Sequence, residues 1–573
     1  MSRVSSARVV LGAVGVTLLT ALGTSGSAGA APPQVLRVGT WNGVPGNVAS
    51  IDAAMSAMHS GDWVLIAPGD YHPRMDYSAA QLSSNAPAAL LDNVPDTHVR
   101  GMDRNGVIID GTKAGSATPC SSAPAAQDFG PSDSSGAHRG RNGLEATVSG
   151  VYFENLTACN FLSGSAGSGN EIWWNGGDDT GTIGIGTWWG NYISATSSFY
   201  NGPATAASYG IFVSNSRGPG SMTDVYANNF SDSGIYIGAC PDCNAVVNRA
   251  HSEYNALGYS GTNSGGHLVI ENSEWDNNKT GFVSNSQNSA DPPSPQDGSC
   301  PGNGIGPTGT HSCWVFENNY VHDNNNPNVP AIGDAAIGPV GGGVVLAGDR
   351  NNTVVNNRFV NNGSWAVLTT LFPDTGAANP NNIPDCHGGL LGGTVLGVTV
   401  PCLYDDWGNQ VSNNTFSHNG FFGNVTNGDI ADLSIPPLEK FGAPGNCFSG
   451  NTEVGGAKAK TWPVYLQTSQ AKCGMGGGYP DVASTTVLLA QVACATQAFF
   501  SCPSTALTNY PRTTSVAMPT MRPQTTMPDP CLGVPVNPWC PAAPAGPAHP
   551  AAAAAPHQMP SARVPAAVRL TGA

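Results

Sequence analysis

The chain has 573 residues, with 22 Lys and Arg against 38 Asp and Glu, and a formal net charge of −16. Only 10% of the residues are charged, while 73 Gly and 45 Pro make up about a fifth of the chain. This composition argues against a nucleic-acid binder, which needs a basic stripe, and against a helical bundle, which needs amphipathic runs of Ala, Leu, Glu and Lys.

The first 30 residues have the form of a secretory signal peptide. Arg3 and Arg8 precede an apolar run from Val9 to Leu22, and small residues follow as far as Ala30. The apolar run is too short to span a bilayer comfortably, so a retained membrane anchor is the less favoured alternative. We expect cleavage after Ala30 and a secreted, extracellular protein that no longer contacts a membrane.

The segment from Trp173 to Trp189 is the best candidate for a sugar site. It holds the aromatic pairs Trp173-Trp174 and Trp188-Trp189, with Asp178-Asp179 between them. Aromatic faces can stack on sugar rings, and paired carboxylates can divide acid and base work at a glycosidic bond. We therefore predict Asp178 and Asp179 as catalytic and the four tryptophans as substrate-binding. The alternative is a plain turn, since residues 176–181 have turn composition.

The middle of the chain carries an internal repeat of short strand-like segments. We align them on the aromatic residues Phe230, Tyr254, Trp275, Tyr320, Phe359 and Phe416, of which the first three are 24 and 21 residues apart. Five residues before these anchors stand Val225, Arg249, Ile270, Val315, Val354 and Val411. A repeat of this length with Asn-rich turns indicates a solenoid, in which each Asn amide can bond the same residue of the next coil. Aligned apolar columns argue against disorder, and the period is about half that of a propeller blade.

Segments 315–324, 354–363 and 411–420 resemble coils of right-handed parallel β-helix proteins of the pectin-lyase-like superfamily. Residues 51–58 and 61–71 also resemble that superfamily, which implies a short capping helix and then the first strand. The resemblance covers about residues 35–455 and predicts an all-β, right-handed parallel β-helix. Activity does not transfer, because the pectate lyase and mannuronan epimerase motifs are absent. Of the polygalacturonase motifs only Asp-Asp survives, at residues 178–179 and 405–406.

The expected domain organisation follows from these features. We predict a signal peptide (1–30), an N-terminal cap with the first coils (31–150), the main β-helix (151–455), a C-terminal closing segment (456–504) and a Pro/Thr/Ala-rich tail (505–573). The tail has little apolar periodicity, so we expect it to be disordered or extended and dispensable for folding.

The fourteen cysteines all follow the predicted signal peptide. An even number in an exported chain indicates disulfides, and we expect sequence-adjacent cysteines to pair. Cys240-Pro-Asp-Cys243 could be redox-active or half of a zinc site, but no second motif at zinc spacing supports this. A structural disulfide is the favoured interpretation there.

Two further groups of residues could carry chemistry. His322 could act as a base oriented by Asp323, although a solvated or ladder-bonded turn residue is the favoured interpretation. Asp405, Asp406, Asp429 and Asp432 could hold calcium, although a plain acidic surface is favoured because no calcium-loop motif is present. No other cofactor and no metal ligands are predicted.

The negative charge favours a neutral polysaccharide over a polyuronate as the partner of a monomeric protein. Whether the protein is an enzyme stays open, and two hypotheses remain. One is a polysaccharide hydrolase or lyase, and the other is a non-catalytic surface or matrix protein that uses the solenoid as a scaffold. An enzyme should gather two or three ionisable side chains at one point of a groove, whereas a scaffold should scatter them.

Overall fold

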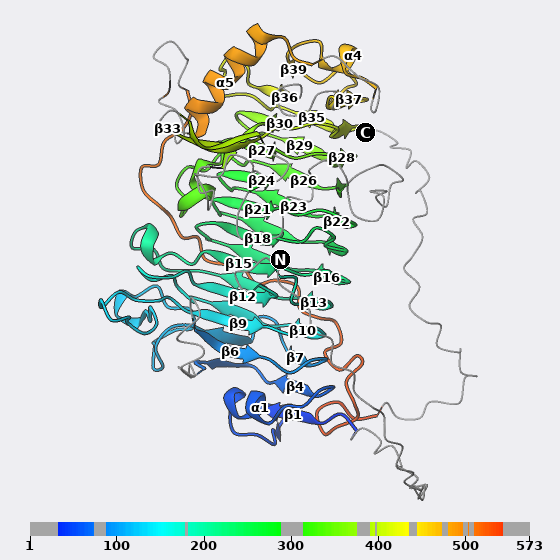
Figure 1. The fold of residues 1–573 in the computed structure, drawn as a ribbon. Coiled ribbons are helices and arrows are strands. Elements are labelled where there is room, and N and C mark those ends of the chain that lie inside the picture. Colours follow the sequence, from blue (N-terminus) through cyan, green and yellow to red (C-terminus); the bar gives the residue numbers. More distant parts are fainter. Residues whose placement is uncertain are drawn as a thin grey trace, which may run out of the picture.

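The computed structural model shows an elongated solenoid of stacked coils (Figure 1). The structure describes residues 32–73, 87–177, 182–287, 313–374, 390–395, 398–434, 444–472, 479–496, 502 and 509–542. Successive strands of the chain fall in turn into long parallel sheets, which we call sheets I, II and III. The predicted parallel β-helix is confirmed.

The strands of each sheet are given in stacking order. Sheet I consists of β1 (Val35–Val38), β4 (Trp63–Ile66), β7 (His98–Gly101), β10 (Val151–Glu154), β13 (Trp188–Asn191), β16 (Gly220–Thr223), β19 (Ala245–Asn248), β22 (Leu268–Glu271), β25 (Trp314–Glu317), β28 (Thr353–Val355), β34 (Gln410–Ser412) and β37 (Cys447–Ser449). Sheet II consists of β5 (Gly69–Tyr71), β8 (Val107–Asp110), β11 (Thr157–Cys159), β14 (Ser194–Thr196), β17 (Tyr226–Asn228), β20 (His251–Glu253), β23 (Glu274–Asp276), β26 (Tyr320–His322), β29 (Arg358–Val360), β35 (Thr415–Ser417) and β38 (Thr452–Glu453). Sheet III consists of β6 (Ala88–Asp92), β9 (Asn142–Ala146), β12 (Asn170–Asn175), β15 (Tyr209–Ser214), β18 (Ser233–Gly238), β21 (Leu257–Thr262), β24 (Thr280–Asn285), β27 (Gly342–Ala347), β30 (Trp365–Thr370), β36 (Gly428–Leu433) and β39 (Thr461–Trp462).

Other elements lie outside these sheets. The antiparallel strands are β2 (Thr40–Trp41) with β3 (Val44–Pro45), and β31 (Phe372–Asp374) and β32 (Leu390–Val395) on either side of β33 (Val398–Tyr404). The helices are α1 (Ile51–Ala57), α4 (Leu466–Ser469) and α5 (Val482–Thr496), and the 3-10 helices are η1 (Pro124–Ala126), η2 (Pro203–Thr205) and η4 (Gly333–Ile337).

The core is built from columns of inward side chains that stack from coil to coil. All five residues that we predicted to point inward are at most 2% exposed, namely Val225, Ile270, Val315, Val354 and Val411. The alignment nevertheless slipped by three residues at Phe230 and two at Tyr254, because Ala227 and Ser252 are in register with Trp275. It slipped by one residue at Tyr320. Val321, not Tyr320, is in register with Trp275 and Phe359, and Phe316, not Val315, is in register with Ile270 and Val354. Because strand side chains alternate, this slip assigns β26 residues to the wrong face.

Asparagine ladders run along the turns, as predicted. The Oδ1 atom of each Asn accepts a hydrogen bond from the backbone N–H of the residue one coil before it, as between Asn319 and Asn357 at 2.8 Å. The ladders are Asn319–Asn357–Asn414–Asn451, Asn255–Asn278–Asn324–Asn362–Asn419 and Asn352–Asn409–Asn446. These amides satisfy polar groups that have no access to water.

The two ends of the solenoid carry helices. At the N-terminal end the predicted capping helix is α1, whose first turn is capped by the Ser50 side chain accepting from the Ala53 N–H. Ile51 and Ala54 of α1 are buried against the first coil. At the other end α4 lies beside β37 and α5 beside β36. Covering an open sheet edge in this way removes a template for aggregation.

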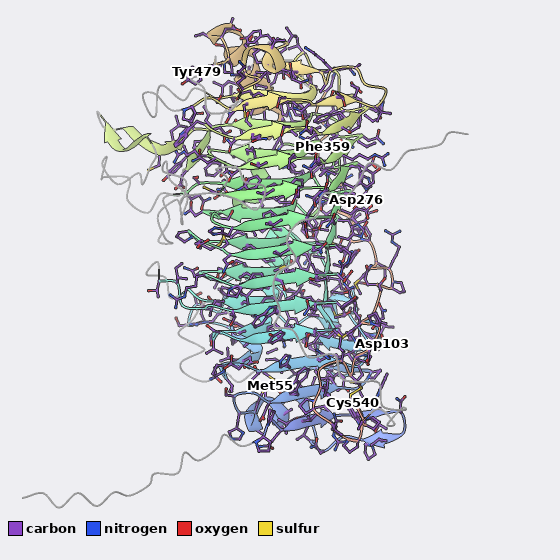
Figure 2. All side chains as sticks on the ribbon, turned by 90° about the vertical axis from the view of Figure 1, so that its right-hand side faces the viewer. Met55, Asp103, Asp276, Phe359, Tyr479 and Cys540 are labelled. Atoms are coloured by element: carbon purple, nitrogen blue, oxygen red, sulfur yellow. A yellow bond between two sulfur atoms is a disulfide. The ribbon has the colours of Figure 1, made fainter. Side chains whose placement is uncertain are left out.

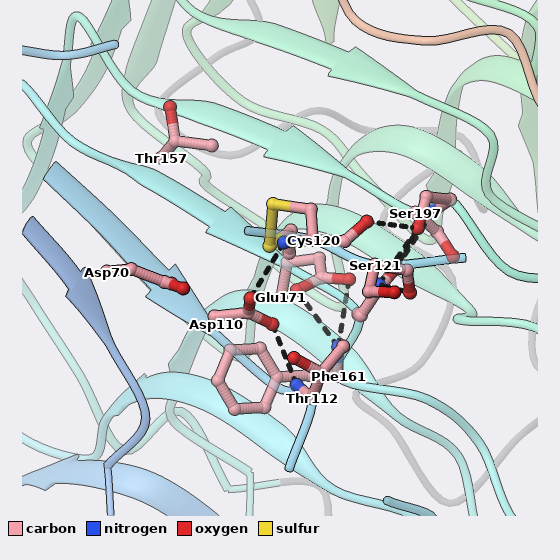
Figure 3. Close-up of a disulfide and its surroundings, with 12 residues drawn as sticks. Asp70, Asp110, Thr112, Cys120, Ser121, Thr157, Phe161, Glu171 and Ser197 are labelled. Carbon is pink, nitrogen blue, oxygen red and sulfur yellow. Dashed lines mark hydrogen bonds between the residues drawn. A yellow bond between two sulfur atoms is a disulfide. The ribbon is translucent and has the colours of Figure 1, made fainter. Parts of the chain in front are cut away.

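The described disulfides agree with pairing of sequence-adjacent cysteines. They join Cys120 to Cys159, Cys240 to Cys243, Cys494 to Cys502 and Cys531 to Cys540. Cys313, Cys402 and Cys447 are disulfide-bonded too, while Cys300, Cys386 and Cys473 lie outside the described residues. Figure 3 shows the Cys120–Cys159 bond, beside which the Asp110 carboxylate accepts backbone hydrogen bonds from Thr112 and Cys120, both at 2.7 Å.

Part of the predicted tail, residues 509–542, is described by the structure and is extended, one of the two alternatives that we expected, while residues 543–573 lie outside the described residues. Residues 509–542, which we call the strap, are extended but not disordered, because they pack along the solenoid from its C-terminal to its N-terminal coils (Figure 1). Tyr510 is buried beside Trp365 near the start of the strap. Near its end Trp539 is buried beside Trp63 and donates to the Val44 carbonyl oxygen. The strap buries only isolated side chains, and its backbone groups form hydrogen bonds with the coils. Its sequence therefore has no apolar periodicity, and this is why composition allowed disorder there.

In the described part of the chain, no helix is long and apolar enough to cross a membrane.

Candidate active site

The predicted tryptophan site is not one groove. Trp174 and Trp188 are fully buried in the core, so the prediction that they bind sugar is wrong. Trp173 is half-buried on the outer face of sheet III, where it stacks on Phe212, and Trp189 is half-buried on sheet I, where it stacks on Tyr152. Neighbouring residues of one strand face opposite sides, which separates each pair. Asp178 and Asp179 lie outside the described residues.

Ionisable side chains gather instead on the outer face of sheet II. Strand β20 presents His251 and Glu253 on either side of the inward Ser252, and β23 presents Glu274 and Asp276 on either side of the inward Trp275. Strand β26 adds Tyr320 and His322 around Val321. The parallel register therefore stacks these six side chains in two outward columns, and Figure 2 labels Asp276 on this face.

Short hydrogen bonds pair the members of this cluster across the strands. His251 Nε2 lies 2.7 Å from Asp276 Oδ1. His322 bridges two carboxylates, with Nε2 3.0 Å from Glu274 Oε1 and Nδ1 2.8 Å from Asp323 Oδ2. His322 thus bonds the neighbouring coil, as one part of our favoured interpretation had it, but it lies in strand β26 and not in a solvated turn. The interaction with Asp323 that we considered is present.

The pairing sets the charges of the cluster. Burial alone would lower the pKa of His251, but its bond to Asp276 and the surrounding carboxylates raise it. Burial likewise lowers the pKa of His322, but the hydrogen bonds to Glu274 and Asp323 outweigh this effect and raise the pKa overall. The hydrogen bond from His322 lowers the pKa of Glu274. The bond between His322 and Glu274 thus favours the charged form of both side chains.

A groove of about 470 Å³ opens over this cluster, along the edge between sheets I and II. It is lined by Arg249, Ala250, His251, Asn272, Ser273, Glu274, Asn318 and Tyr320. The side chain of Glu274 is 45% exposed and that of His251 22% exposed, so both reach solvent at the groove. The Arg358 guanidinium lies 4.8 Å from the Tyr320 ring centroid and holds the ring in place.

A cation could bind at one point of the cluster. Donor atoms of His251, Glu274 and Asp276 lie within 4.8 Å of one another. An imidazole among carboxylates suits Zn²⁺ or Mn²⁺ better than Ca²⁺, which prefers oxygen ligands throughout.

The acidic group that we considered for calcium is not an acidic surface, because all four side chains are at most 5% exposed. Asp429 bonds Asn419 and the Lys460 N–H, and Asp432 bonds Thr369 and Asn446. Burial, followed by the charges of Asp349 and Asp405, raises the pKa of Asp406. The preference for an exposed acidic surface is therefore wrong, and these groups belong to the interior.

A second cavity, of about 300 Å³, lies on the outer face of sheet III. Its lining is largely apolar and includes Phe212, Leu257 and Leu368. Asp232 also lines it, but Tyr209 donates to one carboxylate oxygen and Ser233 to the other. Asp334 is a second carboxylate in the lining, and it accepts a hydrogen bond from the Gln287 side chain at 2.9 Å. The rest of the lining is largely apolar, and no histidine among the described residues lines the cavity.

Sequence reasoning missed His251, Glu274 and Asp276 because of the slipped alignment. Anchored on Tyr254, Trp275 and Tyr320, these residues fall into different columns. Anchored on the inward residues Ser252, Trp275 and Val321, every member of the cluster falls one residue before or after its anchor. A strict two-residue alternation around the anchor was the signal that could have found them.

No protein-family model matches the sequence, and the comparison with curated proteins gives no match either. Among solved structures, the chain is similar to the A-module of a mannuronan C-5 epimerase of Azotobacter vinelandii, with 12% identity over 70% of this chain and 89% of that one and a TM-score of 0.39. It is also similar to a rhamnogalacturonan lyase, with 12% identity over 67% of this chain and 82% of that one (TM-score 0.36). A pectate lyase matches with 13% identity over 68% of this chain and 76% of that one (TM-score 0.31). Sequence identities this low bear on the fold alone. The assignment of the fold to a parallel β-helix rests on the parallel sheets described above.

Proposed function

We propose that the protein is an exported enzyme that binds and cleaves a polysaccharide in the groove over sheet II. The observation that carries this proposal is the convergence of His251, Glu274 and Asp276, whose donor atoms lie within 4.8 Å of one another beside an open groove. This gathering supports an enzyme over a scaffold, which we expect to scatter its ionisable groups.

The cluster supplies the two roles that cleavage of a glycosidic bond needs. The imidazolium of His251, held by Asp276, can give a proton to the leaving oxygen. The ionised, half-exposed carboxylate of Glu274 can take a proton, either from an attacking water or from a carbon next to a carboxyl group. The first course is hydrolysis and the second is elimination. Tyr320 offers an aromatic edge of the groove to a sugar ring.

Export and the nature of the polysaccharide form part of the proposal. The disulfides support an oxidising compartment outside the cytosol. The net charge of −16 favours a neutral polysaccharide. A polyuronate would need cationic side chains at the groove, such as Arg249, to offset the repulsion between like charges.

The test starts from the purified full chain and a panel of plant and microbial polysaccharides. Reducing-end release reports either reaction, and an unsaturated product distinguishes elimination from hydrolysis. On the substrate found, Glu274→Gln and His251→Asn should each lower kcat by at least about 100-fold, the usual range for a lost general acid or base. Binding of the same polysaccharide should change far less.

A matched control exists elsewhere on the solenoid. His267 forms an equally short pair with Asp242, with 2.8 Å between Nδ1 and Oδ1, but lies outside the groove. His267→Asn should retain wild-type kcat. Equal losses in His267→Asn and His251→Asn would contradict the proposed site. Binding without any turnover in the wild-type protein would favour the scaffold hypothesis instead.

A further inference from the structure

The strap crosses the outer face of sheet II beside the proposed site. The Pro519 carbonyl oxygen accepts hydrogen bonds from Asn228 and Asn229 at the end of β17. Five residues later, Gln524 pairs with Asn105, which lies at the opposite edge of sheet II, just before β8. The strap therefore passes diagonally over the sheet between these points.

The next residues fix the strap to the solenoid edge between sheets I and II. Arg104 donates to the Thr525 carbonyl oxygen at 3.0 Å, and its other nitrogens bond Ser194 and Ile193. Asn155 accepts from Thr526 and from the Met527 N–H. The strap thus reaches the same edge along which the groove runs, a few coils closer to the N-terminus.

Exposure changes where the strap crosses. The outward residues Thr157, Ser194 and Tyr226, on β11, β14 and β17, are at most 1% exposed although they point away from the core. Their counterparts in the same column on β20 and β23, His251 and Glu274, reach solvent. The polar face of sheet II is therefore covered on the N-terminal side and open on the C-terminal side.

This arrangement limits what can lie in the groove. The lining residues follow the solenoid axis over β20, β23 and β26, so a sugar chain in contact with all three would lie parallel to that axis. Glu274 on β23 and Ser194 on β14 are three strand spacings apart, which corresponds to a distance of about 14 Å. Beyond that distance a chain extending toward the N-terminal coils would meet the strap.

Resting on the proposed function, we infer that the strap is the end wall of the groove, so that the site takes the end of a polysaccharide chain and not its middle. Arg522 of the strap reaches from this wall to β20, the strand next to β23, with its guanidinium 3.5 Å from Glu253 Oε1 and its side chain 74% exposed. It is placed to donate hydrogen bonds to the hydroxyl groups of the last sugar ring. The enzyme then releases short products of one size from one end.

The first test uses only the full chain and the polysaccharide that it cleaves. Product sizing over time should show one short oligosaccharide from the first minutes, with the viscosity of the polymer falling late. Substrates whose chain ends are blocked should be cleaved at least about tenfold more slowly than the same chains with free ends. An early ladder of product sizes with a rapid fall in viscosity would overturn the inference. Failure to cleave or bind any polysaccharide would count against the proposed function itself.

A variant then assigns the effect to the strap. A chain that ends after Pro511 keeps Tyr510 in its buried position and lacks the wall. It should cleave end-blocked chains as fast as free ones and give a ladder of products. Since loss of the strap could unfold the protein, Arg522→Ala provides a second measurement on an intact strap. It should raise KM for short oligosaccharides several-fold and leave kcat unchanged, whereas unchanged product patterns and KM in both variants would refute a role of the strap.

Discussion

Removal of one amide from the middle of an asparagine ladder should destabilise the solenoid strongly. Asn357 Oδ1 accepts from the backbone N–H of Asn319 at 2.8 Å and from its side-chain amide at 3.2 Å. Asn357 Nδ2 donates to the Phe316 carbonyl oxygen at 2.9 Å and to Asn414 Oδ1 at 3.0 Å. In Asn357→Ala all four bonds are lost at a site that is 1% exposed.

The size of the effect follows from what is left behind. The Asn319 amide keeps its bond to the Ile270 carbonyl oxygen, and Asn414 Oδ1 keeps the bond from the Asn357 N–H. The buried N–H of Asn319 loses its acceptor, which costs about 1–3 kcal/mol, and the other lost bonds add about 0.5–1.5 kcal/mol each. With three such bonds, we expect Asn357→Ala to lower the free energy of unfolding by roughly 2.5–7.5 kcal/mol.

Urea unfolding followed by circular dichroism measures this change as a lower midpoint at an unchanged slope. Asn318→Gly is the matched control, because Asn318 is exposed and has a positive φ of 56° that glycine adopts without strain. The control should stay within about 0.5 kcal/mol of the wild type. If Asn357→Ala also stayed within that range, the ladders could not be the interactions that hold the turns together.

Two further predictions concern single groups in the N-terminal coils. Burial raises the pKa of Asp92 to about 6, so the folded chain binds this proton more tightly than the unfolded chain and stability falls as the pH rises from about 4 to 6. The Asp92→Asn variant has no charge to bury and avoids that loss. Its free energy of unfolding should exceed that of the wild type by up to roughly 3 kcal/mol at pH 8, but not at pH 4. Equal stabilities of the two proteins at pH 8 would contradict this reasoning. The Cys120–Cys159 disulfide closes a loop over a sequence separation of 39, so replacing both cysteines with serine should cost about 4 kcal/mol in thermal or urea unfolding, and a loss below about 1 kcal/mol would show that the unfolded chain is not restrained by it.

Repetition made the fold predictable from the sequence. The recurring Val and aromatic residues around Trp275, Phe359 and Phe416 mark inward columns, and the Asn residues two positions before the last two of these anchors, Asn357 and Asn414, are ladder members in the structure. A stacked coil buries the same positions each time, so a few correctly aligned repeats define the whole architecture. The capping helix at residues 51–57 was predicted from the family resemblance of residues 51–58, and the need to cover an open end agrees with it.

The site could not be predicted with the same ease, because it depends on which of two neighbouring residues faces outward. Slips of two residues at Tyr254 and one residue at Tyr320 moved His251, Tyr320 and His322 out of the columns that hold Glu274 and Asp276. The tryptophan pairs illustrate the same limit. Two adjacent indoles in a strand cannot line one surface, so Trp174 and Trp188 went to the core while Trp173 and Trp189 remained on separate sheets.

The strap was hidden for a different reason. Its contacts join residues far apart in the sequence, for example across 430 and 432 positions between Arg100 and the Pro530 and Leu532 carbonyl oxygens. These bonds use backbone oxygens of the strap, which any sequence offers, so no pattern of side chains announces them. Composition alone therefore suggested disorder where the chain is held by the coils.

The central claim is that sheet II carries a polysaccharide site at His251, Glu274 and Tyr320. A crystal structure of the Glu274→Gln variant, soaked with an oligosaccharide of the polysaccharide that the wild type cleaves, tests it most directly. We predict sugar rings in the groove along β20, β23 and β26, with the scissile bond beside residue 274 and one chain end against the strap near Arg522. Sugar bound only on sheet III, in its apolar cavity or over Trp173, with an empty groove on sheet II, would contradict the claim.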